Sequence, residues 1–495
     1  MSDHEAALEA GAVAEADVLD STEAGNKVIR GGGLRMASYV SGIVVGLISA
    51  PLLVRHLSVA DFGVYATVNS IVFVVGGLVE GGLGNVAIRG YAQSGADERR
   101  RLMDALFGLR LVLTTGGLLA ALAFTVLAGY HWKVTAGVAI GGIGMILGSW
   151  QVTGTVPLQA ALKLGSLAVI DMTRQVVSTV AIAALVLAGT GVVPFFAVSP
   201  LAFLFALGAT FAAGGRQLTA SIDVARWRQL LKETALYAVA TALGVLYFQI
   251  AIISTSLLSS ATQAGFYSAA FRVVDLANGV PWLLASSAFP LLARAAHNDA
   301  DRLRYATQRL FETCLVVGAG FCVVIVIGAP FALQVIGGDK LDPAVPTLRL
   351  LGAGVPFTFL VAHWSFTLLS LHRHRELVIA NAIAVVVAMV LSGILVSTHG
   401  ARGAGIVTVT LEVVLATLYA VMLTRAHPEL RPEIGVVPKV LAALGVALAV
   451  GVLLPGGVVV ATCAAAAVYV ALALLLRAVP EEIAAALAER LPRRG

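Results

Sequence analysis

The sequence predicts an all-α membrane protein with about 14 transmembrane helices, arranged as two parallel six-helix lobes followed by two additional helices. Hydrophobic residues make up 59% of the chain and charged residues 12%, whereas ordinary soluble domains carry roughly 25% charged residues. Apolar segments of roughly 20 residues, the length that spans the hydrocarbon core of a bilayer, recur along the chain. A short motif also recurs after roughly 200 residues, which indicates a duplicated bundle.

Two pairs of matching segments define this repeat. Asp61–Tyr65, with the sequence DFGVY, corresponds to Gln263–Tyr267, with the sequence QAGFY. Ala168–Ile170 corresponds to Leu377–Ile379 at nearly the same separation. An even number of helices in each repeat gives both the same orientation in the membrane, so we expect an axis along the membrane normal to relate them.

Charged or glycine-containing loops separate the apolar segments and set the order of the elements. The predicted helices of the first lobe are Leu34–Arg55, Val64–Ile88, Asp104–Gly129, Val134–Val156, Leu167–Leu187 and Val192–Ala213. Those of the second lobe are Ala235–Leu258, Ala264–Leu292, Leu310–Ile336, Leu348–Leu371, Leu377–Val396 and Gly403–Thr424, and the two additional helices are Val436–Leu454 and Gly456–Leu476. The chain then divides into an acidic cytosolic tail (1–33), an N-terminal lobe (34–215), a cytosolic linker (216–234), a C-terminal lobe (235–425), the additional helices (436–476) and a cytosolic tail (477–495).

The basic residues of the loops predict the orientation. Alternate loops are rich in arginine, whereas the intervening loops hold few cations, namely Arg55, Lys133, Lys340, Arg349 and Arg402. Because basic loops stay in the cytosol, we expect a multi-pass protein with both termini cytosolic. Far more arginine than lysine, with abundant alanine, favours a bacterial source and hence the cytoplasmic membrane. The net charge of +5 reflects topology and predicts no nucleic-acid partner.

Two predicted helices carry polar residues on one face at helical spacing. Helix Leu167–Leu187 holds Asp171, Arg174, Gln175 and Ser178. Helix Ala264–Leu292 holds Ser268, Arg272, Asp275 and Asn278. A charge at the centre of the bilayer costs roughly 2.5–3.5 kcal/mol, while an exposed ion pair on a helix returns only about 0.2–0.5 kcal/mol. These stripes are therefore expected to line a cavity that binds substrate, or else to neutralise themselves between packed helices.

Single ionisable residues also lie within or beside apolar segments: Glu80, Arg110, His363 and Glu412. We interpret Glu80 and Glu412 as candidate coupling or structural acids.

The remaining chemistry-bearing residues predict neither an enzyme nor a metalloprotein. Cys314, Cys322 and Cys463 lie in apolar runs without metal-ligand spacing. No phosphate-cradling Gly-x4-Gly-Lys-Ser/Thr segment occurs, which argues against ATP hydrolysis by the chain. The sequence thus predicts no cofactor, and energy is expected from an ion gradient, the membrane potential or consumption of the product outside.

The segment after the first helix resembles the start of the polysaccharide flippases of the multidrug/oligosaccharidyl-lipid/polysaccharide exporter superfamily. The resemblance is carried by Arg55-His56-Leu57, Phe62-Gly63-Val64-Tyr65, Glu80-Gly81-Gly82-Leu83 and Arg89, and by the Gly-x-Tyr repeat at Gly265. It implies two lobes in a V around a cavity that opens alternately to each side. It also implies a polyprenyl-pyrophosphate-linked oligosaccharide as substrate, moved from the inner to the outer leaflet for surface polysaccharide biosynthesis. Membrane lipid, a polysaccharide polymerase and glycosyltransferases are the partners this implies.

Two other functions stay open. A cation-coupled multidrug exporter of the same superfamily resembles this fold, but such exporters usually stop at 12 helices and place an acid in helix 1 or 7, where Leu34–Arg55 and Ala235–Leu258 have none. A membrane-embedded polysaccharide polymerase or acyltransferase would need a large outer loop, and the predicted outer loops, such as Thr190-Gly191 and Ser259-Ser260, are short.

Overall fold

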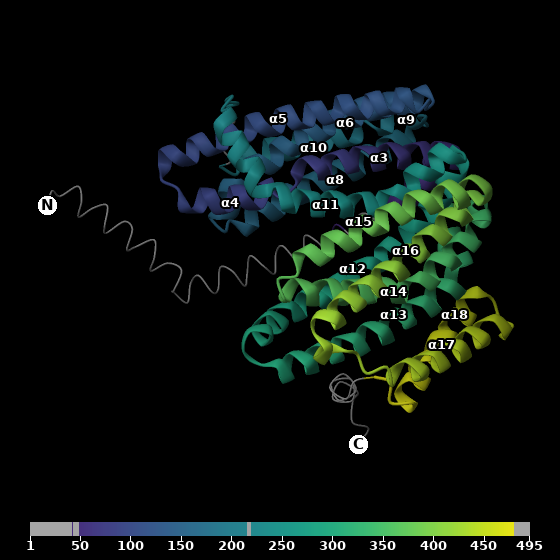
Figure 1. The fold of residues 1–495 in the computed structure, drawn as a ribbon. Helices are drawn as coiled ribbons and strands as arrows, with labels where there is room; N and C mark the ends of the chain where they lie inside the picture. The colour runs from purple at the N-terminus through teal and green to yellow at the C-terminus, as the bar shows by residue number, and fades with distance from the viewer. Residues whose placement is uncertain (1–41, 43–48, 215–218, 480–495) are drawn as a thin grey trace, which may run out of the picture. The chain divides into compact units, whose positions relative to one another are not determined.

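A computed structural model describes residues 42, 49–214 and 219–479 of the protein, most of which form long helices (Figure 1). Among these residues no strand occurs, and the predicted all-α membrane fold is confirmed. The predicted tail at 1–33, all but the first three residues of the predicted tail at 477–495, and most of the first predicted helix lie outside the described residues.

The helices follow the predicted order closely. Those of the first half are α3 (Val59–Glu80), α4 (Leu83–Gln93), α5 (Ala96–Leu127), α6 (Trp132–Gly154), α7 (Val156–Ala160), α8 (Leu164–Leu187), α9 (Val192–Phe195) and α10 (Val198–Ala212). Those of the second half are α11 (Val224–Leu258), α12 (Ala261–Asn298), α13 (Ala300–Gly337), α14 (Val345–Ser370), α15 (His374–Leu391), α16 (Ser397–Ala426), α17 (Val436–Leu453) and α18 (Val458–Leu475).

The described part of the chain contains 12 helical stretches long and apolar enough to cross a membrane. One of them, His374–Ala426, is 53 residues long and covers two predicted helices. A π-helical turn at Ser392–Val396 and a left-handed glycine, Gly400 with φ 52°, interrupt it. Splitting this stretch and adding the first predicted helix, of which residues 42 and 49–55 are described and helical, accounts for about 14 spans.

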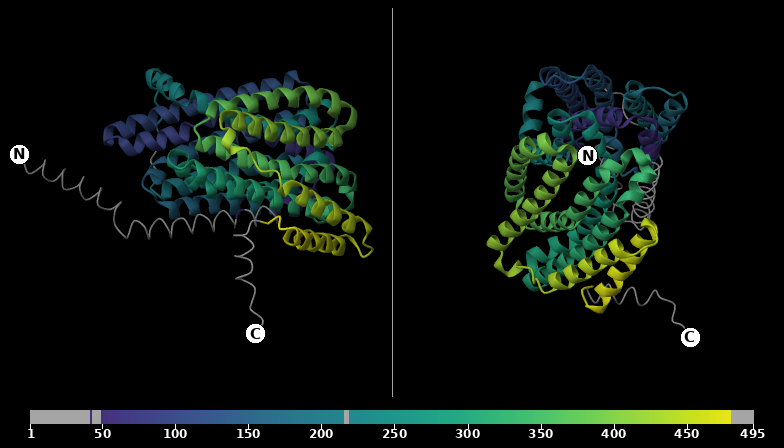
Figure 2. Two further views of the ribbon diagram at one scale, coloured as in Figure 1. Left: turned by 60° about the horizontal axis from the view of Figure 1, so that its bottom comes forward. Right: turned by 90° about the vertical axis from the view of Figure 1, so that its right-hand side faces the viewer.

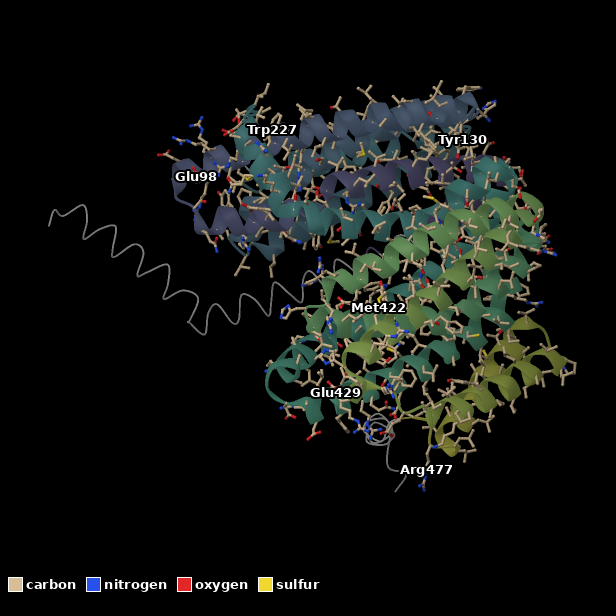
Figure 3. All side chains as sticks on the ribbon, in the orientation of Figure 1. Glu98, Tyr130, Trp227, Met422, Glu429 and Arg477 are labelled. Atoms are coloured by element: carbon tan, nitrogen blue, oxygen red, sulfur yellow. The ribbon has the colours of Figure 1, made fainter. Side chains whose placement is uncertain are left out.

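Several helices extend beyond their apolar segments at the predicted cytosolic side. α11 begins at Val224 rather than at Ala235, because its first turns pack on α5. The indole nitrogen of Trp227 donates a hydrogen bond to the carbonyl of Ala105 at 2.8 Å, and Arg226 pairs with Glu98 (Figure 3 labels Trp227 and Glu98). A count of apolar residues misses such turns, since their polar side chains face water or headgroups.

The chain forms two compact units. Of the described residues, the first unit contains 42, 49–50 and those in 79–123 and 136–238, and the second contains those in 51–78, 124–135 and 239–479. In the first unit α8 packs along α10. In the second, α14 packs against α12, α13 and α16, and the α17–α18 pair lies against α13 (yellow in Figure 2). The boundaries of the two predicted lobes stay a prediction.

The orientation is testable by labelling. In a Cys463→Ser background, we expect single cysteines replacing Gly191 and Ser260 to react with an impermeant thiol reagent in intact cells. Cysteines replacing Arg100 and Arg302 should react only after permeabilisation, because their loops carry the cytosolic arginines. Labelling at position 100 in intact cells would reverse the predicted topology.

Candidate functional site

The polar stripe of α12 contains the residue with the clearest site-like surroundings, Arg272. This arginine is half-buried, and its guanidinium carbon lies 5.6 Å from the centre of the Phe62 ring of α3. A cation over an aromatic face is stabilised by about 0.5–2 kcal/mol. Asp275 is exposed, and among the described residues it forms no ion pair with Arg272. The two charges still attract each other at longer range, so their mutual neutralisation stays a prediction beside the aromatic contact of Arg272.

Asn278, further along α12, faces a small cavity in the second unit. The cavity measures about 20 Å³, which is room for about one water molecule. Glu412 of α16 lies in the same wall and is buried, with Oε1 accepting a hydrogen bond from the hydroxyl of Tyr247. Asn278 Oδ1 and Glu412 Oε2 are buried, and within the described ranges neither accepts a hydrogen bond. Glu412 is thus an internal acid beside a space that could hold one polar occupant.

Phe62 belongs to the repeated motif, and the structure shows why that motif is repeated. α3 and α12 meet at Gly63 and Gly265. A β-carbon on Gly63 would overlap the carbonyl oxygen of Ala261 and lie 2.8 Å from the backbone nitrogen of Gly265. A β-carbon on Gly265 would overlap the carbonyl oxygen of Val59. Each glycine therefore meets the residue four positions before the other, and we call this reciprocal contact the glycine crossing.

Both helices of the glycine crossing begin with a serine cap at the same place in the repeat. Ser58 accepts the N–H of Asp61 at 3.0 Å, and Ser260 accepts the N–H of Gln263 at 3.2 Å. Such caps satisfy free N–H groups of the first helical turn and fix where it starts. The serines, three residues before the matched Asp61 and Gln263, are a signal that the sequence analysis missed.

The scarce cations of the predicted outer loops surround this crossing. Lys340 donates to three carbonyls at the end of the first helix, including that of Leu57 at 2.7 Å. Arg55 donates in return to the carbonyl of Val335, in the last turn of α13, at 2.9 Å. Lys133 pairs with Asp61 at 2.9 Å. Cations at helix C-termini satisfy free carbonyls and favour the helix dipole, so these three residues join the helix ends of the second unit.

The stripe of α8 belongs to the first unit. Asp171, Arg174 and Gln175 are all half-buried. The guanidinium carbon of Arg174 lies 5.7 Å from the centre of the Phe203 ring of α10, and no ion pair with Asp171 occurs in the described part of the chain. Arg174 is thus held on an aromatic ring, as Arg272 is.

Glu80 has a partner that the sequence analysis did not assign. The guanidinium of Arg110 is fully buried, donates to both carboxylate oxygens of Glu80 at 2.7 Å, and donates to Thr153 at 2.9 Å. Glu80 ends α3 and is followed by Gly81 and Gly82, with φ of 36° and 84°. Left-handed backbone is favourable only for glycine, so these two residues break the helix and turn Glu80 toward Arg110. Position in the chain alone could not show this pairing, since the two residues are 30 positions apart.

Metal-binding groups are absent where the structure can be described. No group of three or more His, Cys, Asp or Glu residues there could hold a metal ion. Cys314 and Cys322 are buried, whereas Cys463 is exposed.

Comparisons with known proteins agree with this geometry. The family described as polysaccharide biosynthesis protein matches residues 28–296, more than half of the chain. The chain has no match among curated protein sequences.

Several solved structures share the fold. The lipid II flippase MurJ, in an inward closed conformation, has a TM-score of 0.73 and 12% identity, covering 90% of this chain and 99% of its own. A multidrug resistance MATE family transporter of the MOP superfamily, inward-facing, has a TM-score of 0.64 and 16% identity, covering 80% of this chain and 98% of its own. A MOP superfamily transporter from Pyrococcus furiosus has a TM-score of 0.51 and 16% identity, covering 82% of this chain and 96% of its own. At these identities the likeness concerns the fold.

The glycine crossing predicts strong sensitivity to small side chains. We expect Gly63→Val and Gly265→Val each to destabilise the purified protein by at least about 2 kcal/mol, because the overlap is with backbone that no rotamer change relieves. Gly208→Val on α10 is the matched control, since a β-carbon there has no atom within 4 Å. Thermal unfolding in detergent measures all three variants. Equal midpoints for Gly63→Val and Gly208→Val would refute the close contact.

The Glu80–Arg110 pair predicts a structural role for Glu80. Glu80→Gln leaves the fully buried Arg110 guanidinium without its counter-charge, and since the Glu80 side chain is itself 42% exposed, the loss should stay below the about 3–5 kcal/mol of a fully buried pair. We expect a clear fall in the unfolding midpoint. Glu98→Gln, which breaks a pair whose arginine, Arg226, is 22% exposed, should lower it less. A Glu80→Gln protein as stable as the parent but inactive would instead mark Glu80 as a coupling acid.

Proposed function

We propose that this chain moves a polyprenyl-pyrophosphate-linked oligosaccharide from the inner to the outer leaflet by alternating access. The chain belongs to the polysaccharide biosynthesis protein family. The protein is a multi-pass membrane transporter with the fold of the MOP superfamily. The substrate class, the direction of movement and the bacterial cytoplasmic membrane as location belong to the proposal. Glycosyltransferases would supply the lipid-linked glycan and a polymerase would consume it.

The position of Arg272 carries the proposal. It is the twelfth residue of α12, so it lies roughly 16 Å along the helix from the predicted outer end, about half of the ~30 Å hydrocarbon core. A lone cation at that depth is costly unless it has a ligand or a cavity to face. Arginine binds phosphate groups in a bidentate manner, which suits a pyrophosphate. Phe62 stabilises the guanidinium while no anion is bound.

The remaining site residues would take supporting roles. Asp275, exposed on α12, would contact the sugars, whereas Asn278 would bind water in the small cavity that it lines. Asp171, Arg174 and Gln175 of α8 would provide a second polar surface of the same kind. Among the acids, the burial of Glu412 beside a water-sized cavity supports a coupling role, whereas the pairing of Glu80 with Arg110 supports a structural one.

A cation-coupled drug exporter is the second candidate. Its support is the likeness to the MATE transporter and the internal acid Glu412. Against it, α17 and α18 extend the chain beyond the 12 helices usual for such exporters. The cationic Arg272 would also repel a cationic drug.

Reconstituted vesicles separate the two candidates. A polyprenyl-pyrophosphate-linked disaccharide with a fluorophore on its sugar is incorporated into both leaflets, and an impermeant quencher is added outside. We expect quenching of the outer leaflet only in protein-free vesicles and of both leaflets with the protein. Transport of a cationic dye without movement of the lipid-linked sugar would overturn the proposal in favour of the exporter.

The same assay tests Arg272. Arg272→Ala should reduce the flipping rate by at least tenfold, and Arg272→Lys should restore it only in part, because an ammonium cannot bind a phosphate bidentately. The exchange Arg272→Asp with Asp275→Arg should stay inactive, since it moves the cation about 4.5 Å along the helix axis. Arg294→Ala, at the exposed end of the same helix, is the control and should be unaffected. Normal flipping by the exchanged protein would make Arg272 a packing residue.

A further inference from the structure

Two joined cavities lie beside the α17–α18 pair, in the second unit. The first measures about 410 Å³ and has charged walls that include Arg309, Lys439 and Arg477. The second measures about 390 Å³ and has almost wholly apolar walls, formed by α13 and α18. Leu474 and Val479 line both cavities, so the polar space adjoins the apolar one. This shape fits a molecule with a charged head and an apolar chain.

The pairing of the charged side chains around the polar cavity indicates which charge the head group of a bound molecule would carry. Two acids also line the polar cavity, but both already have partners: Glu312 accepts from Arg309 at 2.9 Å, and Glu433 accepts from Arg304 at 3.1 Å. Lys439 donates to the backbone carbonyl of Arg477 at 3.4 Å, and neither residue has an ion-pair partner among residues 219–479. Within the described residues, Lys439 and Arg477 are thus the two cations of this cavity that no acid neutralises, which favours an anion.

Arg477 occupies a position where glycine would be less strained. It follows α18 with φ of 50°, and the N–H groups of Arg477 and Ala478 close the helix on the carbonyls of Leu474 and Ala473. Such a left-handed C-terminal residue is usually glycine, because a β-carbon disfavours this conformation. An arginine there places a guanidinium at the mouth of the polar cavity (Figure 3 labels Arg477).

The apolar cavity has the length of a lipid chain. Its wall on α13 extends from Thr313 to Val324, roughly 16 Å at 1.5 Å per residue. One leaflet of the hydrocarbon core is about 15 Å deep. Tyr469 of α18 donates to the carbonyl of Val316 at 2.7 Å and lies over Gly320, which fixes one wall. A chain lying here would reach from the headgroup level to the middle of the bilayer.

We propose that these joined cavities form a binding site for an anionic membrane phospholipid. The phosphate lies beside Lys439 and Arg477, and an acyl chain lies between α13 and α18. The charged end is on the predicted cytosolic side, where anionic lipids and basic pockets between helices meet. The bound lipid fills the space between α18 and α13 and so holds the two additional helices to the bundle. The site differs from the polar stripe of Arg272, because no residue of α12 lines either cavity.

Native mass spectrometry of the full-length protein tests this site with phosphatidylglycerol and phosphatidylcholine as probes. We expect retained phosphatidylglycerol adducts with a Kd at least tenfold lower than that for phosphatidylcholine. Lys439→Ala with Arg477→Ala should abolish the preference, whereas the control Arg294→Ala with Arg375→Ala, at other predicted cytosolic positions, should keep it. Equal binding of the two lipids by the parent protein would overturn the proposal.

A second pair of variants tests the apolar part. Val470→Trp should weaken phosphatidylglycerol binding at least tenfold by filling the groove, while Val459→Trp, also exposed on α18 but outside it, should not. Glycerol phosphate, which has no acyl chain, should not compete. Displacement of phosphatidylglycerol by an equimolar polyprenyl pyrophosphate would assign the groove to the transported lipid and overturn the proposal. All these readouts are binding constants, so they are independent of whether the flipping proposal holds.

Discussion

The backbone contact between Gly63 and Gly265 is the constraint on which the second unit depends. Lipid offers no hydrophobic drive for helices to associate, so small residues that allow close backbone approach hold membrane helices together. Here the two glycines of the repeat remove the β-carbons that would separate α3 from α12. That contact places Phe62, the residue before Gly63, against Arg272 of α12. The repeated motif thus joins two helices and positions the arginine proposed to bind substrate.

Three of the described cations inside the predicted membrane spans share one feature. Each lies against a group that stabilises its positive charge. Arg110 is buried with Glu80 and Thr153, and Arg174 and Arg272 lie over aromatic rings. At the predicted outer ends, Arg55 and Lys340 bind free carbonyls and Lys133 binds Asp61. Glu80 already neutralises the charge of Arg110. An aromatic ring leaves the positive charge of a guanidinium unneutralised, so the guanidinium can still bind an anion. This difference is why Arg272, rather than Arg110, is the proposed substrate ligand.

Periodicity and loop charge predicted most of the fold. The apolar segments predicted helices such as α8 and α17 nearly to the residue, because a hydrocarbon core requires about 20 apolar residues of any span. They missed the first turns of α11, on the predicted cytosolic side, where Trp227 packs on α5 among polar neighbours. The sequence also showed that Arg272 needs a sheltered environment, but not that Phe62 supplies it, since the two are distant in the chain. The Glu80–Arg110 pair was hidden for the same reason, and the orientation of α3 and α12 around their glycines is a three-dimensional property that no local pattern encodes.

Alternating access would require α3 and α12 to separate at the glycine crossing, and a reversible crosslink there tests this requirement most directly. In a protein without its three native cysteines, Ala60→Cys and Thr262→Cys place one thiol at the matched position of each helix, three residues before its glycine. A short cleavable bifunctional thiol reagent can then join the two helices. We expect the joined protein to bind the lipid-linked sugar without flipping it, and cleavage of the reagent to restore flipping. Full flipping with the crosslink quantitatively formed would contradict the requirement.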